Sequence, residues 1–192
     1  MKVAERELSF LSIEQIRQLL NALSDDALLI AKVCLATGAR WSEAEGLRIS
    51  QVRGGQIQFT GTKSGKNRTV PVDDALIGEL GQHLEARYGG EKGLADRFFM
   101  SSYEAFRKVV EKCGLELPRG QLTHVLRHTF ASHFIMNGGN ILVLQRILGH
   151  SSLTMTMRYA HLAPDHLQEA KNLNPLRSIN QQTTNATALT VG

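Results

Sequence analysis

The sequence contains little cysteine, and neither cysteine belongs to a redox or metal-binding motif. Cys34 and Cys113 are the two cysteines in 192 residues, and no CxxC pattern occurs. Two cysteines this far apart give no disulfide framework, so we expect both to be reduced side chains that contribute to packing. A fold stabilised by disulfides is therefore excluded.

The sequence also lacks a long apolar run. No stretch approaches the roughly 20 apolar residues that a membrane-spanning helix needs, and the N-terminus carries no secretory pattern. Hydrophobic residues make up 42% of the chain and charged residues 21%, which is ordinary for a globular protein with a real core. We expect a cytoplasmic protein that has no membrane partner.

Acidic residues are missing from two long segments, although the whole chain contains 18 and its net charge is only +4. Residues 46–72 contain five basic residues and no Asp or Glu. Residues 117–164 again contain no Asp or Glu, but four arginines and five histidines lie there. Such segments indicate a surface that binds a polyanion. Uneven sampling of a solvated surface gives the same pattern, so charge alone does not decide.

Hydrophobic spacing predicts a mainly helical α+β domain over residues 1–175 and a flexible polar tail at 176–192. The period changes in residues 48–72, which predict a small antiparallel sheet inserted after the third helix, with turns at 54–55 and 63–67. Capping residues and glycines mark the helix ends. We expect helices over residues 13–23, 27–37, 42–47, 74–88, 101–114, 122–136, 141–148, 153–161 and 165–172.

The stretch SLTMTMRYAH, residues 152–161, places a tyrosine next to an arginine in the second acid-free segment. If Tyr159 attacks a phosphodiester, negative charge builds up on the non-bridging oxygens, and guanidinium groups are suited to bind it. The phenol, with an ordinary pKa of about 10, must lose its proton, and the departing sugar oxygen must gain one. Arginines can carry the charge, so this chemistry requires no metal.

Each candidate partner of this tyrosine also has an ordinary structural explanation. Arg40 follows a buried helix, where it can neutralise the helix dipole or pair with Glu43. Lys63 lies in a turn between strands, where most lysines are only solvated. His150 follows a glycine at a helix boundary, where it can act as a cap.

His124, Arg127 and His128 fall on one helical face at positions i, i+3 and i+4. For His128 and His133 we favour structural hydrogen bonds. His124, His128 and His133 together also suggest a metalloenzyme. However, a zincin helix needs Glu beside its first histidine, where Val125 stands, and the acid-free segment supplies no carboxylate ligand.

Five separated boxes resemble, in order, those of the tyrosine recombinases, also called phage-type integrases. The family pattern has Arg in a TGxRxSE box, Lys in a β-turn, HxLRH, LGH and then Tyr. The resemblance runs from about Leu8 to about Lys171, nearly the whole folded part. The matching boxes are ATGARWSEAEGL, TKSGKNRTVPV, LTHVLRHTFASHF, LGHSS and TMRYAHL.

The resemblance implies a role for each matched residue. Arg40 and Arg127 would bind the scissile phosphate, and Glu43 would support the site. Lys63 would act as the general acid on the 5′ oxygen, although Lys66 lies in the same turn and competes for that role.

The histidines and the tyrosine complete the implied set. His124 would be the proton acceptor or a donor to the phosphate, and His150 would hydrogen-bond the phosphate. Tyr159 would be the nucleophile, forming a 3′-phosphotyrosyl bond that conserves the energy of the broken phosphodiester for rejoining. No metal, ATP or other cofactor is implied. Tyr88 and Tyr103 lie outside the boxes, and we interpret them as packing residues.

The implied function is site-specific recombination at double-stranded DNA attachment sites, with phage integration and excision as the setting. We expect a monomer, or a weak dimer through residues 160–175, in free solution, and a homo-tetramer on DNA in which residues 164–170 dock onto a neighbouring subunit. DNA-bending accessory proteins are further expected partners, and the bacterial host cytoplasm, at the nucleoid, is the expected location. The additional residues expected to contact DNA are Arg53, Lys66, Arg68 and Arg158.

Several alternatives share these features. A chromosome-dimer resolvase or a type IB topoisomerase-like strand transferase would use the same chemistry. A non-catalytic DNA-binding regulator is the alternative from another class, but it would not need Arg40, Arg127 and Tyr159 together. Family members usually carry an N-terminal helical domain that grips the other side of the DNA. Because this sequence starts just before the catalytic domain, we expect an isolated catalytic fragment of a temperate-phage or prophage integrase.

Overall fold

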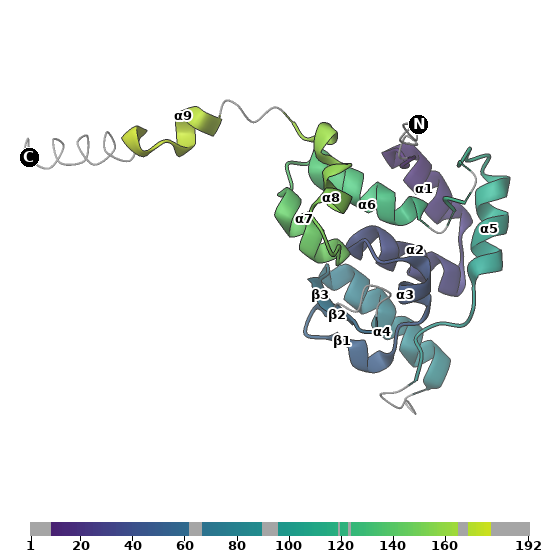
Figure 1. The fold of residues 1–192 in the computed structure, drawn as a ribbon. Coiled ribbons are helices and arrows are strands. Elements are labelled where there is room, and N and C mark those ends of the chain that lie inside the picture. The colour runs from purple at the N-terminus through teal and green to yellow at the C-terminus, as the bar shows by residue number, and fades with distance from the viewer. Residues whose placement is uncertain are drawn as a thin grey trace, which may run out of the picture.

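The computed structural model describes residues 9–61, 67–89, 96–118, 120–122, 124–164 and 169–177. The domain is mostly helical with one small sheet at its edge (Figure 1), so the predicted mainly helical α+β domain is confirmed. The helices of the described residues are α1 Ile13–Ala22, α2 Asp25–Thr37, α3 Trp41–Glu45, α4 Asp74–Tyr88, α5 Tyr103–Lys112, α6 Val125–Met136, α7 Ile141–Leu148, α8 Thr154–Met157 and α9 Glu169–Leu173, with 3₁₀ turns η1 Ile49–Gln51 and η2 Ala160–Leu162.

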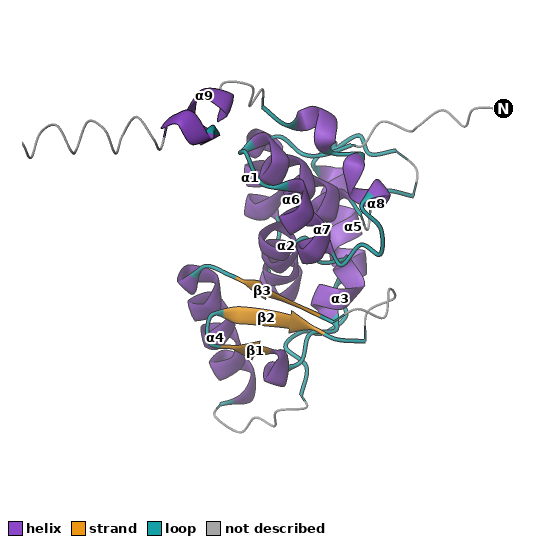
Figure 2. Cartoon of the chain, turned by 60° about the vertical axis from the view of Figure 1, so that its left-hand side comes forward, coloured by secondary structure: helices purple, strands orange, loops and turns teal. Residues whose placement is uncertain are grey.

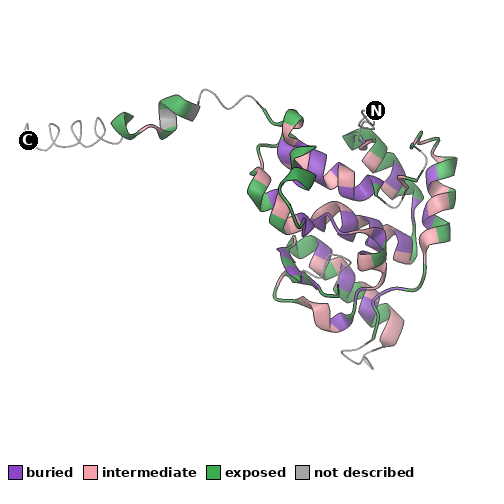
Figure 3. Ribbon diagram, viewed as in Figure 1, coloured by how far each residue is buried: buried purple, intermediate pink, exposed green. Residues whose placement is uncertain are grey.

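Helix α2 runs through the main core of the domain (Figure 3). Its side chains are apolar on nearly all sides, and Ile30, Val33 and Cys34 are fully buried. It packs against α1, α3, α4, α5 and α6. The helix ends at Gly38, which adopts a left-handed conformation with φ of 65°. This end of α2 contributes to the candidate site.

The sheet has three antiparallel strands in the order β1 Val52–Arg53, β2 Gln56–Phe59 and β3 Arg68–Pro71. The predicted sheet and its turn at 54–55 are confirmed. Helix α4 lies beside the sheet (Figure 2), and its buried leucines join Ile57, Phe59 and Val70 in the main core. Residues 62–66, in the predicted turn that contains Lys63 and Lys66, lie outside the described residues.

Several predicted helix boundaries differ from those of the structure, and three of the differences bear on the site. Helix α3 is capped at Arg40 rather than Ser42, because the Glu43 carboxylate accepts a hydrogen bond from the Arg40 backbone N–H. Helix α6 begins at Val125 rather than 122. The helix predicted over 153–161 is broken into α8 and η2, because the Tyr159 backbone bonds three residues back to Thr156, which starts a tighter turn.

A second, smaller core lies where α6, α7 and the α8–η2 segment meet. Ala131 and Ile135 come from α6, Leu144 and Leu148 come from α7, and Tyr159 completes the cluster. The tyrosine ring is therefore held by side chains from two helices. The candidate site lies between this cluster and the end of α2.

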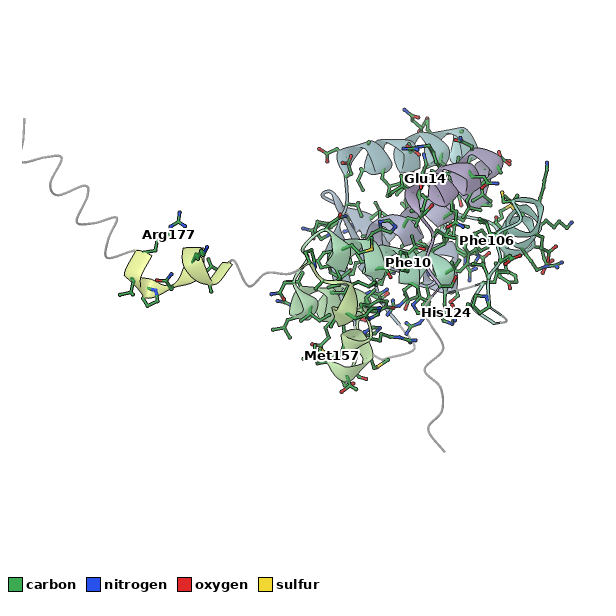
Figure 4. The ribbon with its side chains drawn as sticks, turned by 90° about the horizontal axis from the view of Figure 1, so that it is seen from above. Phe10, Glu14, Phe106, His124, Met157 and Arg177 are labelled. Carbon is green, nitrogen blue, oxygen red and sulfur yellow. The ribbon has the colours of Figure 1, made fainter. Side chains whose placement is uncertain are left out.

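Helix α9 stands away from the rest of the domain (Figures 1 and 4), with Arg177 just beyond it. Leu173 and Leu176 are 76% and 66% exposed. The helix overlaps the one predicted at 165–172, and residues 178–192 of the predicted tail lie outside the described residues. Within the described ranges, no helix is both long and apolar enough to cross a membrane.

Candidate active site

Arg127 lies in the first turn of α6, and its guanidinium is buried at the junction of three helices. Nη1 donates to the carbonyl oxygen of Gly38 at 2.7 Å, and Nη2 donates to that of Leu148 at 2.6 Å. Burial, together with the positive charges of Arg40 and Arg68, lowers the pKa of Arg127 to about 10. The group stays charged at neutral pH, and the ends of α2 and α7 fix its position.

Arg40 and Glu43 form a second fixed pair at the start of α3. Nη1 of Arg40 donates to Oε1 of Glu43 at 3.0 Å, while the Arg40 backbone N–H donates to Oε2 at 3.0 Å. Only 24% of the Arg40 side chain is exposed. Pairing with Glu43 was the structural alternative for Arg40, and the two roles are compatible, because the carboxylate orients a guanidinium that retains further donors.

Arg68 was predicted to contact DNA, but its side chain is only 5% exposed and instead completes the Glu43 cluster. Its Nη2 donates to Oε2 of Glu43 at 2.6 Å, and its guanidinium carbon lies 4.6 Å from the centre of the Phe59 ring. Arg68 shares the inward face of β3 with Val70, two residues on, and this alternation was the sequence signal for its burial.

Glu43 is the carboxylate on which these two arginines converge. Burial alone would raise its pKa, but hydrogen bonds from the Arg68 side chain and the Arg40 backbone, with the charges of both arginines, lower the pKa overall. Glu43 is therefore ionised at neutral pH. It pairs with two guanidinium groups whose charges act on Arg127.

His150 follows the Gly149 cap of α7 and is 8% exposed. Its Nδ1 lies 2.9 Å from Oγ1 of Thr156, a buried hydroxyl on α8 that the sequence did not single out. Burial, and then the positive charges of Arg127, Arg40, Arg158 and Arg68, lower the pKa of His150 to about 4. The imidazole is neutral at physiological pH.

Tyr159 is the last member of the site, and its side chain is only 1% exposed. Its ring packs in the second core, and its hydroxyl lies 2.7 Å from Nδ1 of His128. Burial raises the pKa of the Tyr159 phenol above its ordinary value, although the charges of Arg158 and Arg127 oppose this shift. In the absence of DNA the nucleophile candidate is therefore a neutral phenol.

His128 was expected to form a structural hydrogen bond, and its hydrogen-bond partner is the Tyr159 hydroxyl. This partner lies 31 residues away in sequence, so the local pattern around His128 does not reveal it. His124 is exposed at the N-terminal end of α6 (Figure 4), with its ring centre 6.1 Å from that of His128. His124, Arg127 and His128 thus lie together at the N-terminal end of α6.

The remaining predicted residues lie in several environments. Arg158 is exposed beside Tyr159, and Arg53 is exposed on β1. Tyr88 and Tyr103 pack against the main core, as expected, and the Tyr88 hydroxyl donates to the Arg97 carbonyl at 2.7 Å.

The three histidines considered for a metal site do not converge. His133 lies 2.8 Å from the Leu11 carbonyl oxygen through Nε2, while His128 faces Tyr159. In the part of the chain that the structure describes, no three His, Cys, Asp or Glu side chains are arranged to hold a metal ion. The geometry therefore gives no support to the metalloenzyme alternative.

The site as a whole is suited to binding an anion next to a hydroxyl group. Four arginines act electrostatically on His150, and Glu43 is paired with two of them. The resulting excess positive charge favours a phosphate, and guanidinium groups match its oxygens geometrically. The Tyr159 oxygen is the candidate nucleophile for such a phosphate.

Comparison with known proteins adds independent evidence. A model of the phage integrase family matches residues 9–166. The integrase of Escherichia phage 186 is 54% identical over 179 residues, which are 91% of this chain and 50% of that protein. The tyrosine recombinase XerD of Corynebacterium glutamicum is 33% identical over 181 residues, which are 83% of this chain and 59% of that protein.

A solved structure is also similar. The catalytic domain of bacteriophage HP1 integrase matches with a TM-score of 0.80 and 54% identity, covering 89% of this chain and 98% of that one. The chain spans about half the length of the curated phage integrase that it matches at 54% identity.

Proposed function

Because the chain belongs to the phage integrase family, we propose that it breaks and rejoins DNA strands during site-specific integration and excision of a phage genome. The greater identity to a phage integrase, 54%, than to XerD, 33%, favours this role over that of a chromosome-dimer resolvase. The observation that supports strand transfer is a buried Tyr159 hydroxyl on which the charges of Arg127 and Arg158 act, in a site with excess positive charge.

In the proposed reaction, the Tyr159 oxygen attacks the scissile phosphorus and displaces the 5′ oxygen of the next nucleotide. Arg40 and Arg127 bind the non-bridging oxygens, whose charge grows in the transition state. Glu43 and Arg68 hold Arg40 in position, since all three belong to one hydrogen-bonded cluster. The 3′-phosphotyrosyl bond is then attacked by a 5′-hydroxyl, which regenerates the phosphodiester without ATP.

We assign the remaining roles from the family resemblance and from the local geometry. His150 is neutral and can donate Nε2–H to the phosphate while Nδ1 bonds Thr156. His124 is exposed at the N-terminal end of α6, and we assign it a hydrogen bond to the phosphate. Lys63 is the proposed acid for the 5′ oxygen, and comparing alanine variants of Lys63 and Lys66 would separate these two candidates.

Double-stranded DNA is the proposed partner, with Arg53 and Arg158 as peripheral contacts and Lys66 as a further candidate. Arg68 is no longer a candidate contact because it is buried. We further propose a homo-tetramer on DNA, because exposed Leu173 on α9 offers an apolar face to a neighbouring subunit. DNA-bending proteins would assist assembly, and the reaction would occur in the host cytoplasm, where the DNA is.

The experiment that tests this proposal is covalent capture. The chain is incubated, with and without a chelator, with a pool of nicked duplexes that carry a randomised central segment. A nick lets the fragment beyond the cleavage point diffuse away and traps the adduct. We expect a protein–DNA band on a denaturing gel that persists with the chelator and disappears in Tyr159→Phe. Absence of any adduct, or an adduct in the Phe variant, would refute the proposal.

A further inference from the structure

The oxygen atom that is proposed to attack phosphorus already has a hydrogen-bonding partner. Nδ1 of His128 lies 2.7 Å from the Tyr159 hydroxyl oxygen, and the two ring centres are 6.0 Å apart. His128 is held in α6, where its backbone N–H donates to the His124 carbonyl at 2.9 Å. It directly follows Arg127, so one helical turn fixes both the phosphate clamp and the partner of the phenol.

We propose that His128 accepts the phenolic proton of Tyr159 during strand cleavage, an inference that rests on the proposed function. The O–H bond of Tyr159 breaks and its proton moves to Nδ1 of His128, while the phenolic oxygen forms a bond to phosphorus. The bond from phosphorus to the 5′ oxygen breaks, and that oxygen takes a proton from a separate acid, for which Lys63 is the candidate. On rejoining, the attacking 5′-hydroxyl gives its proton back to the separate acid, and His128 returns its proton to the departing Tyr159 oxygen.

The tautomer of His128 decides whether this transfer is possible. A neutral imidazole has one N–H donor and one acceptor nitrogen, so Nδ1 accepts from the phenol when Nε2 carries the proton. The short Nδ1–oxygen distance suits direct transfer, because a general base must lie within hydrogen-bond reach of the proton that it removes.

The positive charges around His128 oppose proton transfer from Tyr159 until DNA binds. Burial, and then the positive charges of Arg158, His124, Arg127 and His150, lower the pKa of His128 to about 4. A free phenol with a raised pKa therefore keeps its proton. A phosphodiester bound at Arg127 brings negative charge next to the imidazole and offsets this repulsion, which makes His128 a stronger base when substrate is present.

A simpler role for His128 is to hold the tyrosine ring in position without accepting a proton. His128→Asn separates the two roles, because the Asn side-chain oxygen takes approximately the place of Nδ1 and can accept the hydrogen bond but not the proton. His161→Asn is the matched control, since His161 is exposed two residues after Tyr159 and is outside the set of residues assigned to the cleavage reaction. Both variants are checked by thermal unfolding and by DNA binding.

The measurement is the single-turnover rate of adduct formation at saturating DNA, using nicked duplexes enriched from a randomised pool by capture with the unmodified chain. We expect His128→Asn to bind DNA normally but to cleave about 10²-fold more slowly at neutral pH. Its rate should rise by up to about tenfold per pH unit, because hydroxide must then remove the proton. His161→Asn should behave like the unmodified chain.

A second substrate tests which proton His128 handles. Replacing the 5′ oxygen by sulfur makes a leaving group that needs no protonation. This substrate should restore cleavage to a variant that lacks the acid, but not to His128→Asn. If sulfur restores His128→Asn, the residue acts on the leaving group and the proposal is wrong.

Two further results would overturn the inference while leaving the proposed function intact. One is a His128→Asn variant with the rate and pH profile of the unmodified chain. If His128→Asn does not fold, His128→Ala is assayed with added imidazole instead. The second contradicting result is then an Ala variant that folds and binds DNA but whose cleavage rate does not increase when imidazole is added. An unmodified chain that forms no adduct would instead contradict the proposed function.

Discussion

The Arg127 guanidinium donates a hydrogen bond to the carbonyl oxygen of Gly38, which ties the first turn of α6 to the end of α2 across 89 positions of sequence. Gly38 has φ of 65°, a left-handed conformation that exposes this carbonyl at the site. A β-carbon at Gly38 would lie 2.6 Å from side-chain carbons of Leu148 and Phe130. Leu148 provides the second acceptor for Arg127, so Gly38 supports both hydrogen bonds.

Gly38→Ala should therefore destabilise the fold and slow DNA cleavage together. The left-handed conformation costs an L-residue about 1–2 kcal/mol, and overpacking adds about 1–3 kcal/mol. Gly54→Ala is the control, because Gly54 also has positive φ, 56°, but a β-carbon added there would meet no atom within 4 Å. Urea unfolding checks both variants. An equal loss of stability in the two would show that the contacts at Gly38 are unimportant.

Arg40→Ala should reduce the rate of adduct formation by at least about 10²-fold, because it removes a fixed charge from the transition state. Arg107→Ala is the comparison, since Arg107 pairs with Glu104 and Glu111 on the surface of α5. Its cleavage rate should be unchanged. If Arg40→Ala cleaves at the normal rate, its pairing with Glu43 is purely structural.

Acid should destabilise the protein partly through His150. The folded-state pKa of His150 is about 4 and its ordinary value is 6.5. Between these values the unfolded chain binds a proton that the folded chain does not, so stability falls as the pH decreases through this window and is unaffected above it. His150→Asn should remove a slope of up to about 1 kcal/mol per pH unit. Parallel stability profiles of the variant and the unmodified chain would contradict this prediction.

Much of the fold follows from local sequence signals. The Ser12 capping box, with Gln15 as its partner, and the helix end at Gly38 are determined by residues within one turn. The Gly54–Gly55 turn likewise needs only positive φ. Signals of this kind are readable because their energetics involve near neighbours in sequence.

The contacts inside the site could not be predicted in the same way. Arg68 was expected to contact DNA because of its charge, but its position on the inward face of β3 buries the side chain. The His128–Tyr159 bond depends on how α6 packs against the α8–η2 segment, which local pattern does not specify. The break before η2 is also set by burial of the tyrosine ring in the second core.

Leu173→Asp tests the proposed assembly. Leu173 is 76% exposed on α9, so a charge there should leave folding and adduct formation unchanged. If α9 docks onto a neighbouring subunit, the buried charge should abolish tetramers on DNA, because an unpaired charge in an apolar interface is costly. Light scattering of the DNA complex measures this. Tetramers that persist in the variant, or that form in the unmodified chain without DNA, would refute the docking role.

The most direct test of the account is to identify the residue that carries DNA after cleavage. Trypsin cuts after Arg158 and Lys171, so Tyr159 lies in the peptide YAHLAPDHLQEAK, while the hydroxyls of residues 151–156 lie in the preceding one. Nuclease digestion followed by mass spectrometry locates the remaining nucleotide. We predict a nucleotide on Tyr159, linked through its 3′ phosphate. A nucleotide on any other residue would contradict the central claim.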